Sequence, residues 1–123
     1  MEPANPQPTF ATAINCMDGR VQQPVAEFAR RHFGVDFVDM VTTAGVVGHF
    51  HSDLIRQVGI SLDAHQSRGV VVAAHEGCAG NPVSEERQRT QCLEAAEKVA
   101  YAYPETQVVV VWVGLDSSVE TIP

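Results

Sequence analysis

The sequence predicts an α/β fold in three layers, with a central parallel four-stranded sheet and helices on both of its faces. The first observation behind this prediction is that four apolar runs alternate along the chain with three segments of helical periodicity. The second is that the runs at 69–74 and 108–113 are apolar throughout, which is typical of strands buried on both faces. Strands separated by helices pair in parallel, and the helices then cover both faces of the sheet.

Two strands and two helices are predicted in the first half of the chain. Residues 9–15 are expected to form the first strand, and apolar residues at helical spacing predict a helix over 24–33. Gly34 ends this helix, because glycine adopts the left-handed conformation common at helix ends. The second strand is predicted over 35–42 and the second helix over 52–66.

The second half of the chain adds a strand, a helix and a last strand. The strand at 69–74 is followed by Pro82 and Ser84, which are typical of a helix start. The third helix carries an apolar stripe of residues: Cys92, Leu93, Ala96, Val99, Ala100 and Tyr103. The fourth strand is predicted over 108–113, so Trp112 within it is expected in the core, as is Cys92 on the stripe.

Composition restricts the class of protein and its partners. The 123 residues suffice for one domain, which we place at 9–123, after a flexible arm over 1–8 that contains three prolines. A net charge of −7 with a single lysine disfavours nucleic acids and anionic membranes as partners. No apolar run approaches the roughly 20 residues that span a bilayer, and residues 1–10 lack the features of a signal peptide. We therefore expect a soluble, cytoplasmic protein.

Every chemically distinctive stretch of the sequence follows a predicted strand. "CMDGR" follows the first strand, "TTAG" the second, "HEGCAG" the third and "GLDSS" the fourth. The carboxyl ends of parallel strands meet at one edge of the sheet, where ligands bind in such folds. The sequence therefore predicts a single functional site at this edge.

Three residues at this edge are candidate metal ligands. His75 and Cys78 form an H-x-x-C pair in a glycine-containing turn, and Cys16 stands at the end of the first strand. Thiolates and imidazole suit zinc, and three protein ligands with one further position are typical of a catalytic zinc site. The three cysteines are an odd number, which argues against a disulfide framework. We expect one zinc ion per chain.

Asp18 and Arg20 are candidate catalytic residues beside this site. In an extended segment their side chains would share a face with Cys16. Asp18 could ligate the metal as a fourth ligand, or it could pair with Arg20 and leave that position to water. Zinc can lower the pKa of bound water to about 7, which provides a hydroxide nucleophile that Asp18 could orient.

Each candidate also has a simpler interpretation. Taken singly, Cys16 and Cys78 could be buried structural thiols, and the acid–arginine pair a plain surface ion pair. Glu76, inside the H-x-x-C motif, is expected to be a solvated side chain, although it could accept a proton near the metal. His49 and His51 are expected to be polar residues at a helix start that is capped by Ser52, although one of them could shuttle protons. The joint spacing of all the edge residues favours the metal site.

The two motifs C-x-D-x-R and H-x-x-C, in this order, resemble those of the β-class carbonic anhydrases, and the similarity extends over about residues 10–122. The resemblance implies that Cys16, His75 and Cys78 hold zinc and that Asp18 and Arg20 act as a gating and orienting pair. It also implies reversible hydration of carbon dioxide to bicarbonate by a zinc-bound hydroxide. Members of the family are usually dimers or larger assemblies, so we expect a homodimer or higher oligomer.

The sequence departs from the family pattern near the site. The family's R-N-A-G-N stretch is Thr42 to Val46 here, so its arginine and last asparagine are absent. Within this stretch, Ala44, Gly45 and Val46 are candidates for lining an apolar substrate pocket. Such changes around a metal site can cost one or two orders of magnitude in activity or metal affinity.

Two other functions remain open at this point. Some relatives of the family hydrolyse carbonyl sulfide or carbon disulfide with the same ligands, and pocket shape would distinguish them. A non-catalytic zinc-binding relative is the second alternative, and in such a protein Asp18 would stay on the metal as a permanent fourth ligand.

Overall fold

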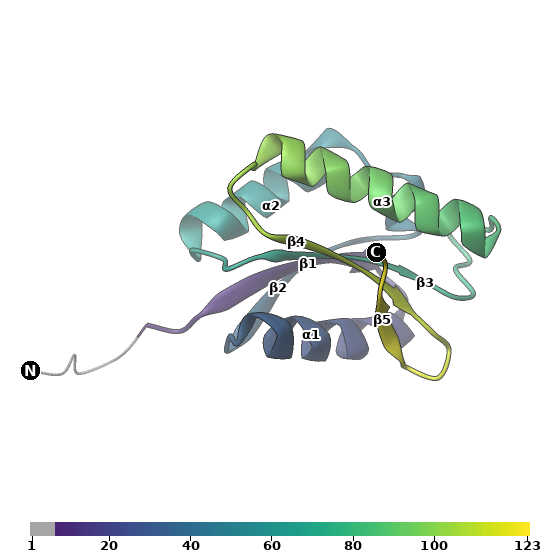
Figure 1. Cartoon of the computed structure of the whole chain (residues 1–123), viewed down its shortest axis with the longest axis horizontal. Coiled ribbons are helices and arrows are strands. Elements are labelled where there is room, and N and C mark those ends of the chain that lie inside the picture. Colours follow the sequence, from purple (N-terminus) through teal and green to yellow (C-terminus); the bar gives the residue numbers. More distant parts are fainter. Residues whose placement is uncertain (1–6) are drawn as a thin grey trace, which may run out of the picture.

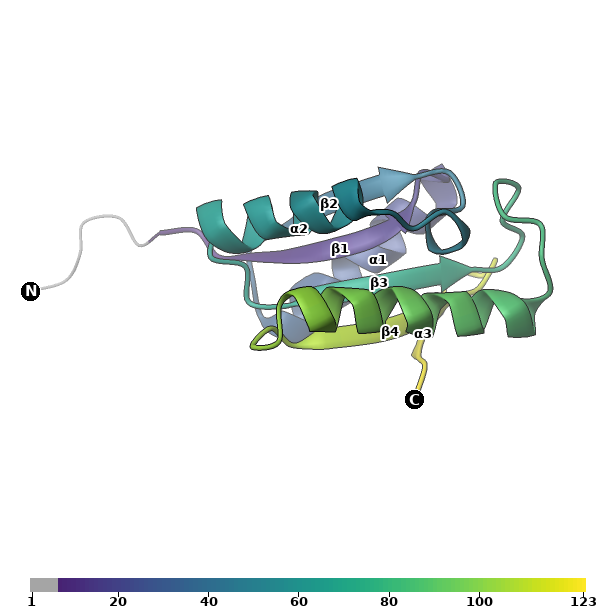
Figure 2. The same cartoon turned by 90° about the horizontal axis from the view of Figure 1, so that it is seen from above.

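Five strands form one sheet in the order β2-β1-β3-β4-β5. Figure 2 shows β2, β1, β3 and β4 side by side in this order. The structure is a computed structural model that describes residues 7–123. The strands are β1 (Phe10–Cys16), β2 (Phe37–Thr43), β3 (Val70–His75), β4 (Val108–Val113) and β5 (Val119–Thr121). The first four are parallel to one another, and β5 runs antiparallel to β4. Of the predicted arm over 1–8, residues 1–6 lie outside the described residues.

Helices cover both faces of the sheet, as predicted. Helix α1 (Gly19–Phe33) lies on one face, and α2 (Ser52–Ala64) and α3 (Glu85–Ala102) lie on the other (Figure 1). A short 3-10 helix, η1 (Val46–Gly48), follows β2. The prediction of a three-layer α/β fold around four parallel strands is thus confirmed. In the described part of the chain, no helix is both long and apolar enough to cross a membrane.

The side chains of β3 alternate between two hydrophobic cores. Val70, Val72 and Ala74 pack in the core under α2 and α3, whereas Val71 and Ala73 pack in the core over α1. This explains the continuous apolar run, because both faces of the strand are buried. Cys92 and Trp112 belong to the core on the α2 and α3 side, as predicted.

Helix α1 begins earlier than predicted, and the reason is Asp18. Its carboxylate accepts a hydrogen bond from the backbone N–H of Arg20 at 2.9 Å and so caps the helix. The predicted start at Pro24 is therefore wrong, and this proline lies inside the helix. The prediction that residues 16, 18 and 20 share one face of an extended segment is also wrong, because the strand ends at Cys16. Gly34 ends α1 in the left-handed conformation, as predicted.

The other helix ends differ from the prediction by smaller amounts. His51 is the N-cap residue of α2, so Ser52 is the first residue of the helix and not its cap. Ser84 caps α3 by accepting a hydrogen bond from the backbone of Arg87 at 3.1 Å, as its place in the sequence indicates. The stripe of α3 is rotated slightly, since Ala95 is buried and Ala100 is exposed.

Strand β5 was not predicted. It forms because the chain reverses after β4 in a turn where the backbone N–H of Gly114 donates to the carbonyl of Ser118 at 2.9 Å. Ser117 in this turn has a φ of 69°, a conformation that non-glycine residues seldom adopt. A strand of three residues gives too short a pattern to be recognised from the sequence.

Candidate metal centre

The strands β1 and β3 separate at their carboxyl ends, and the candidate ligands lie at this separation. Their pairing ends at Ile14 and Val72, although β1 stays paired with β2 as far as Cys16 and β3 with β4 as far as His75. The sheet order also reverses between β1 and β3, since the chain moves from β1 outward to β2 and then returns to β3. Ligands bind at such switch points in open α/β sheets.

The structure brings the three predicted metal ligands together. The ligand atoms of Cys16, His75 and Cys78 lie within 4.8 Å of one another, and all three residues are buried. Among residues 7–123 this is the one group of three or more potential ligands so arranged. The two sulfurs are 3.9 Å apart and both cysteines are free. Two Zn–S bonds of about 2.3 Å at a tetrahedral angle separate the sulfurs by about 3.8 Å, so the pair fits a zinc ion.

The imidazole of His75 is oriented with one nitrogen toward the two thiols. Its Nδ1 lies 3.0 Å from the carbonyl oxygen of Glu76, to which an Nδ1–H donates. This tautomer leaves a lone pair on Nε2, the nitrogen that a metal would take. Within residues 7–123, Nε2 of His75 is the one buried side-chain nitrogen or oxygen that has no hydrogen-bond partner. An unpaired buried polar atom beside two thiols fits a metal ligand.

The two thiols influence each other. Burial raises the pKa of the Cys78 thiol, and the neighbouring Cys16 raises it further. A bound cation would lower the pKa of the thiols, because it favours the thiolate form. The sulfur of Cys16 also accepts a hydrogen bond from the backbone N–H of Gly45 at 3.3 Å, which is suited to a negatively charged sulfur.

Asp18 is paired with Arg20 and lies outside the ligand cluster. The Nε of Arg20 donates to Oδ1 at 3.1 Å and its Nη2 donates to Oδ2 at 2.6 Å. These side-chain hydrogen bonds, followed by the backbone N–H of Arg20, hold the pKa of Asp18 far below its usual range. Both carboxylate oxygens are therefore engaged by one guanidinium. Of the two arrangements that the sequence leaves open, the structure has the ion pair.

The predicted pocket residues pack against the loop that carries the ligands. A Cβ atom added to Gly45, whose φ is 58°, would lie 2.5 Å from the carbonyl oxygen of Gly80. Val46 is buried in the core, whereas Ala44 is exposed. His49 approaches the same loop, with its Nε2 at 3.0 Å from the carbonyl oxygen of Gly80. These contacts fix the H-x-x-C loop against the end of β2, and a role in binding substrate stays a prediction.

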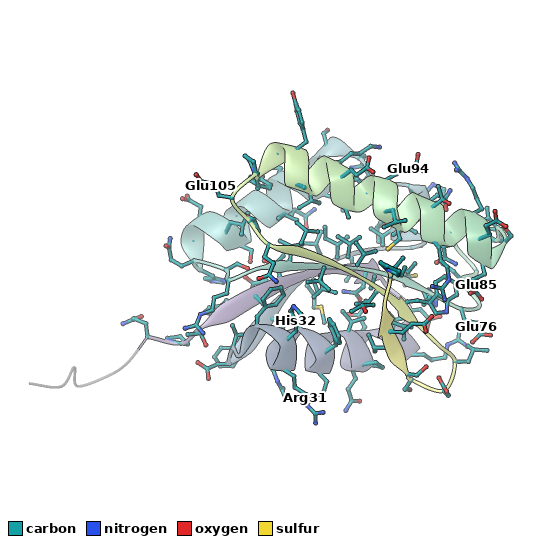
Figure 3. All side chains as sticks on the ribbon, in the orientation of Figure 1. Arg31, His32, Glu76, Glu85, Glu94 and Glu105 are labelled. Atoms are coloured by element: carbon teal, nitrogen blue, oxygen red, sulfur yellow. The ribbon has the colours of Figure 1, made fainter. Side chains whose placement is uncertain are left out.

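An open cavity of about 400 Å³ adjoins the candidate site. Its lining residues come from the ligand loop, the start of α3 and β4: Glu76, Gly77, Cys78, Ala79, Pro82, Val83, Glu85, Gln88 and Trp112. Glu76 and Glu85 lie at this end of the molecule, whereas Glu105 lies at the opposite end (Figure 3). Glu76 is exposed, as expected, but its carboxylate also accepts a hydrogen bond from the backbone of Leu115 at 3.0 Å.

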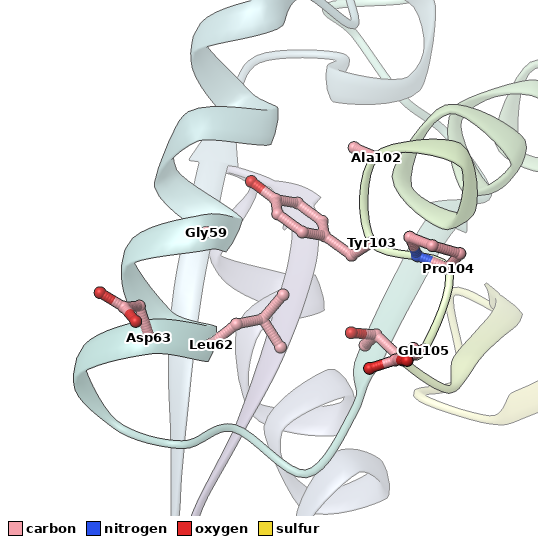
Figure 4. Close-up of a pocket in the computed structure, with 8 residues that line it drawn as sticks. Gly59, Leu62, Asp63, Ala102, Tyr103, Pro104 and Glu105 are labelled. Atoms are coloured by element: carbon pink, nitrogen blue, oxygen red, sulfur yellow. The ribbon is translucent and has the colours of Figure 1, made fainter.

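A second cavity, of about 460 Å³, lies between the ends of α2 and α3 (Figure 4). Tyr103 lines it and donates a hydrogen bond to the carbonyl of Ile55 at 2.7 Å. The acidic residues Asp63 and Glu105 stand at its border. None of the three candidate metal ligands lines this cavity.

Two glutamines at the site were missed from the sequence. Gln88 of α3 and Gln22 of α1 bond to the backbones of His75 and Cys16, respectively. No sequence signal identifies them, because a glutamine within a helix has the same pattern whether it faces solvent or a strand end.

The comparisons with known proteins agree with this geometry. A family model described as "Putative carbonic anhydrase" matches residues 6–123. The chain belongs to the carbonic anhydrase family. The resemblance to the β class is confirmed at the level of the fold, because structures described as β-carbonic anhydrases are among the solved structures that share it. A search of curated proteins gave no significant match.

Three solved structures illustrate how closely the fold is shared. A carbonic anhydrase from Streptococcus mutans is 18% identical, with a TM-score of 0.67, over 95% of this chain and 84% of that one. A β-carbonic anhydrase from the fungus Aspergillus fumigatus is 12% identical, with a TM-score of 0.66, over 98% and 92%. A tetrameric β-carbonic anhydrase from Sordaria macrospora is 13% identical, with a TM-score of 0.60, over 95% and 82%. The fold of this carbonic anhydrase family member is thus that of the β class.

Proposed function

We propose that this chain is a zinc-dependent enzyme that hydrates carbon dioxide reversibly to bicarbonate. One zinc ion per chain would be held by the sulfurs of Cys16 and Cys78 and by Nε2 of His75. Membership of the carbonic anhydrase family supports this proposal, and so does the fit of two sulfurs 3.9 Å apart and an unpaired imidazole nitrogen to zinc.

The observation that carries the catalytic proposal is the pairing of Asp18 with Arg20. When bound, zinc supplies a Lewis acid that brings the pKa of a water molecule to about 7. Arg20 occupies both carboxylate oxygens of Asp18, which leaves three protein ligands rather than four. Because its pKa is lowered, Asp18 stays ionised at neutral pH and can accept a hydrogen bond that orients the nucleophile.

Self-association is a further part of the proposal. Two large apolar side chains, Met17 and Leu115, are exposed beside the ligand edge, at 64% and 57%. Contiguous exposed apolar surface is typical of interfaces between subunits, and these two side chains would contribute to such a surface. We propose a homodimer or higher oligomer, in line with the tetrameric Sordaria macrospora relatives. We also propose a cytoplasmic location.

The test is stopped-flow hydration of carbon dioxide by protein of known zinc content, from neutral to alkaline pH. We expect turnover that rises with pH as the nucleophile ionises and that disappears when a chelator removes the zinc. Stoichiometric zinc without turnover at any pH would contradict the proposal. A parallel assay with carbonyl sulfide would then show whether the same site acts on that gas.

A further inference from the structure

The separation of β1 and β3 leaves backbone groups of both strand ends without a strand to pair with. The backbone N–H of Thr12 donates to the carbonyl of Gly69 at 2.9 Å, which shows which way the peptide groups of the two strands face. Because directions alternate along a strand, the peptide groups of Cys16 and His75 face the gap. Both residues are buried, so water does not replace the missing strand partner and these groups need partners within the protein.

Gln88 replaces the missing strand for His75. Its Oε1 accepts a hydrogen bond from the backbone N–H of His75 at 3.1 Å, and its Nε2 donates to the carbonyl oxygen of the same residue at 2.9 Å. The side chain reaches the strand end from α3 and is only 3% exposed. Both polar atoms of this buried amide therefore form hydrogen bonds with the backbone of one candidate ligand.

Gln22 holds the Cys16 side of the gap from the opposite face of the sheet, through the carbonyl of Cys16 alone. Its Nε2 donates to the carbonyl oxygen of Cys16 at 2.6 Å and to Oδ1 of Asn15 at 2.8 Å. Gln22 belongs to α1 and Gln88 to α3, which lie on different faces of the sheet. Each of the two strand ends that carry a ligand is therefore held by an amide from a different layer.

We propose that Gln22 and Gln88 are positioning residues that hold Cys16 and His75 in the geometry that binds the metal. The inference rests on the proposed function, because it takes these two residues as zinc ligands. With its backbone held by Gln88 and its Nδ1 held by the carbonyl of Glu76, His75 presents Nε2 in one direction. Because the two amides occupy backbone groups of His75 and Cys16 that face the gap, these groups are not free to pair with the neighbouring strand.

The chemistry of the amide explains why glutamine is required. Methionine has nearly the same length but neither donates nor accepts a strong hydrogen bond. Glutamate keeps an acceptor for the N–H of His75, but its second carboxylate oxygen would face the carbonyl oxygen of His75 and repel it. Gln88→Met therefore removes both hydrogen bonds with little change of shape, and Gln88→Glu removes one of them. Gln57→Met is the matched control, because that amide donates to Asp53 on its own helix at 2.9 Å.

The experiment compares the full-length wild type with Gln88→Met, Gln88→Glu, Gln22→Met and Gln57→Met. The zinc dissociation constant is measured by competition with a chromophoric chelator, at a temperature at which circular dichroism shows each metal-free chain to be folded. The visible absorption of the cobalt(II)-loaded proteins reports ligand geometry independently of activity. We expect Gln88→Met to raise the zinc dissociation constant about 10- to 100-fold and to shift the cobalt bands. Gln22→Met should raise the zinc dissociation constant about tenfold and should also shift the cobalt bands. Gln57→Met should change neither the dissociation constant nor the bands.

The outcomes separate this inference from the proposed function. A wild type that fails to bind zinc at one ion per chain would overturn the proposed function. A wild type that binds zinc, together with glutamine variants that have unchanged affinity and unchanged cobalt spectra, would overturn this inference alone. A lower unfolding temperature as the sole effect would also overturn it, because the amides would then stabilise the fold without positioning the ligands. If Gln88→Met does not fold, Gln88→Glu and Gln22→Met decide the question by the same two measurements.

Discussion

Two polar clusters occupy opposite ends of the sheet, and they differ in whether their buried atoms have partners. Toward the amino ends of the strands, a hydrogen-bonded chain joins Thr12, Ser61, Asp39 and His65. The hydroxyls of Thr12 and Ser61 are 2.6 Å apart, Ser61 donates to Asp39 at 2.7 Å, and Nδ1 of His65 lies 2.6 Å from the same carboxylate oxygen. At the carboxyl ends, Nε2 of His75 has no partner at all.

The comparison teaches how to distinguish a structural network from a binding site. Both clusters contain a histidine, and each joins residues from different parts of the chain. A network in which the polar groups satisfy one another stabilises the fold and offers nothing to a ligand. A buried nitrogen that lacks a partner costs about 1–3 kcal/mol, and a metal ion held beside the two thiols would offset this cost. The predictions below test this difference, beginning with the largest expected effect.

Replacing the two histidines in parallel would test the comparison most severely. We expect His75→Gln to weaken zinc binding about a thousandfold, since it removes one of three protein ligands. His65→Gln should leave zinc binding unchanged, because that imidazole is engaged by Asp39. Zinc content after dialysis and competition with a chelator measure both effects. Equal loss of zinc in the two variants would contradict the distinction between the clusters.

The ion pair at the border of the candidate metal centre should matter for turnover and not for metal content. We expect Asp18→Asn to lower the rate of carbon dioxide hydration by about 10²- to 10⁴-fold, as for removal of a general acid–base group. The zinc content should stay at one ion per chain. Asp53→Asn is the control, because Asp53 is also paired with an arginine, at 2.7 Å, but on the exposed surface of α2. A loss of zinc in Asp18→Asn would instead indicate a direct ligand.

The sequence predicts the place of the site better than its local geometry. Alternating strands and helices place Cys16 and His75 at one edge, because parallel strands have their carboxyl ends together. The path after Cys16 could have been predicted, since aspartate is a favoured N-cap residue and Asp18 precedes the helical segment. The expectation of an extended segment through Arg20 is wrong, because Arg20 lies in the first turn of α1.

Other features depend on packing that no local pattern contains. The amide of Gln88 contacts His75 only because α3 passes over the end of β3. The two residues are 13 positions apart in the sequence, so no local pattern links them. The chain from Thr12 through Ser61 to Asp39 likewise joins three different elements. Periodicity predicts which faces are buried, but it does not predict which buried polar groups will pair across them.

The satisfied network should contribute to stability alone. We expect Ser61→Ala to lower the free energy of unfolding by about 1–3 kcal/mol. The substitution removes one hydrogen bond from the buried Thr12 hydroxyl and one from the Asp39 carboxylate. Urea unfolding measures the change, and zinc affinity should not move. Ser52→Ala, at an exposed position of the same helix, is the control and should change stability by no more than a few tenths of a kcal/mol. A change in zinc affinity in Ser61→Ala would show that the two clusters are coupled.

The smallest expected effect is a pH dependence of stability that comes from the Asp18–Arg20 pair. The folded-state pKa of Asp18 is lowered, chiefly by hydrogen bonds from Arg20, so the unfolded chain binds more protons in this range. The pair therefore stabilises the fold above the unfolded pKa of about 3.9, and this stabilisation is lost as the pH falls toward the folded value. In Asp18→Asn this acid-dependent contribution should be absent, while helix capping is retained because asparagine is also a good N-cap residue. Urea unfolding of metal-free wild type and variant between about pH 2 and pH 6 would measure it, since the thiols stay protonated there. The two stability curves should converge as the pH falls below about 4, and parallel curves over this whole range would show that the exposed pair contributes nothing beyond the cap.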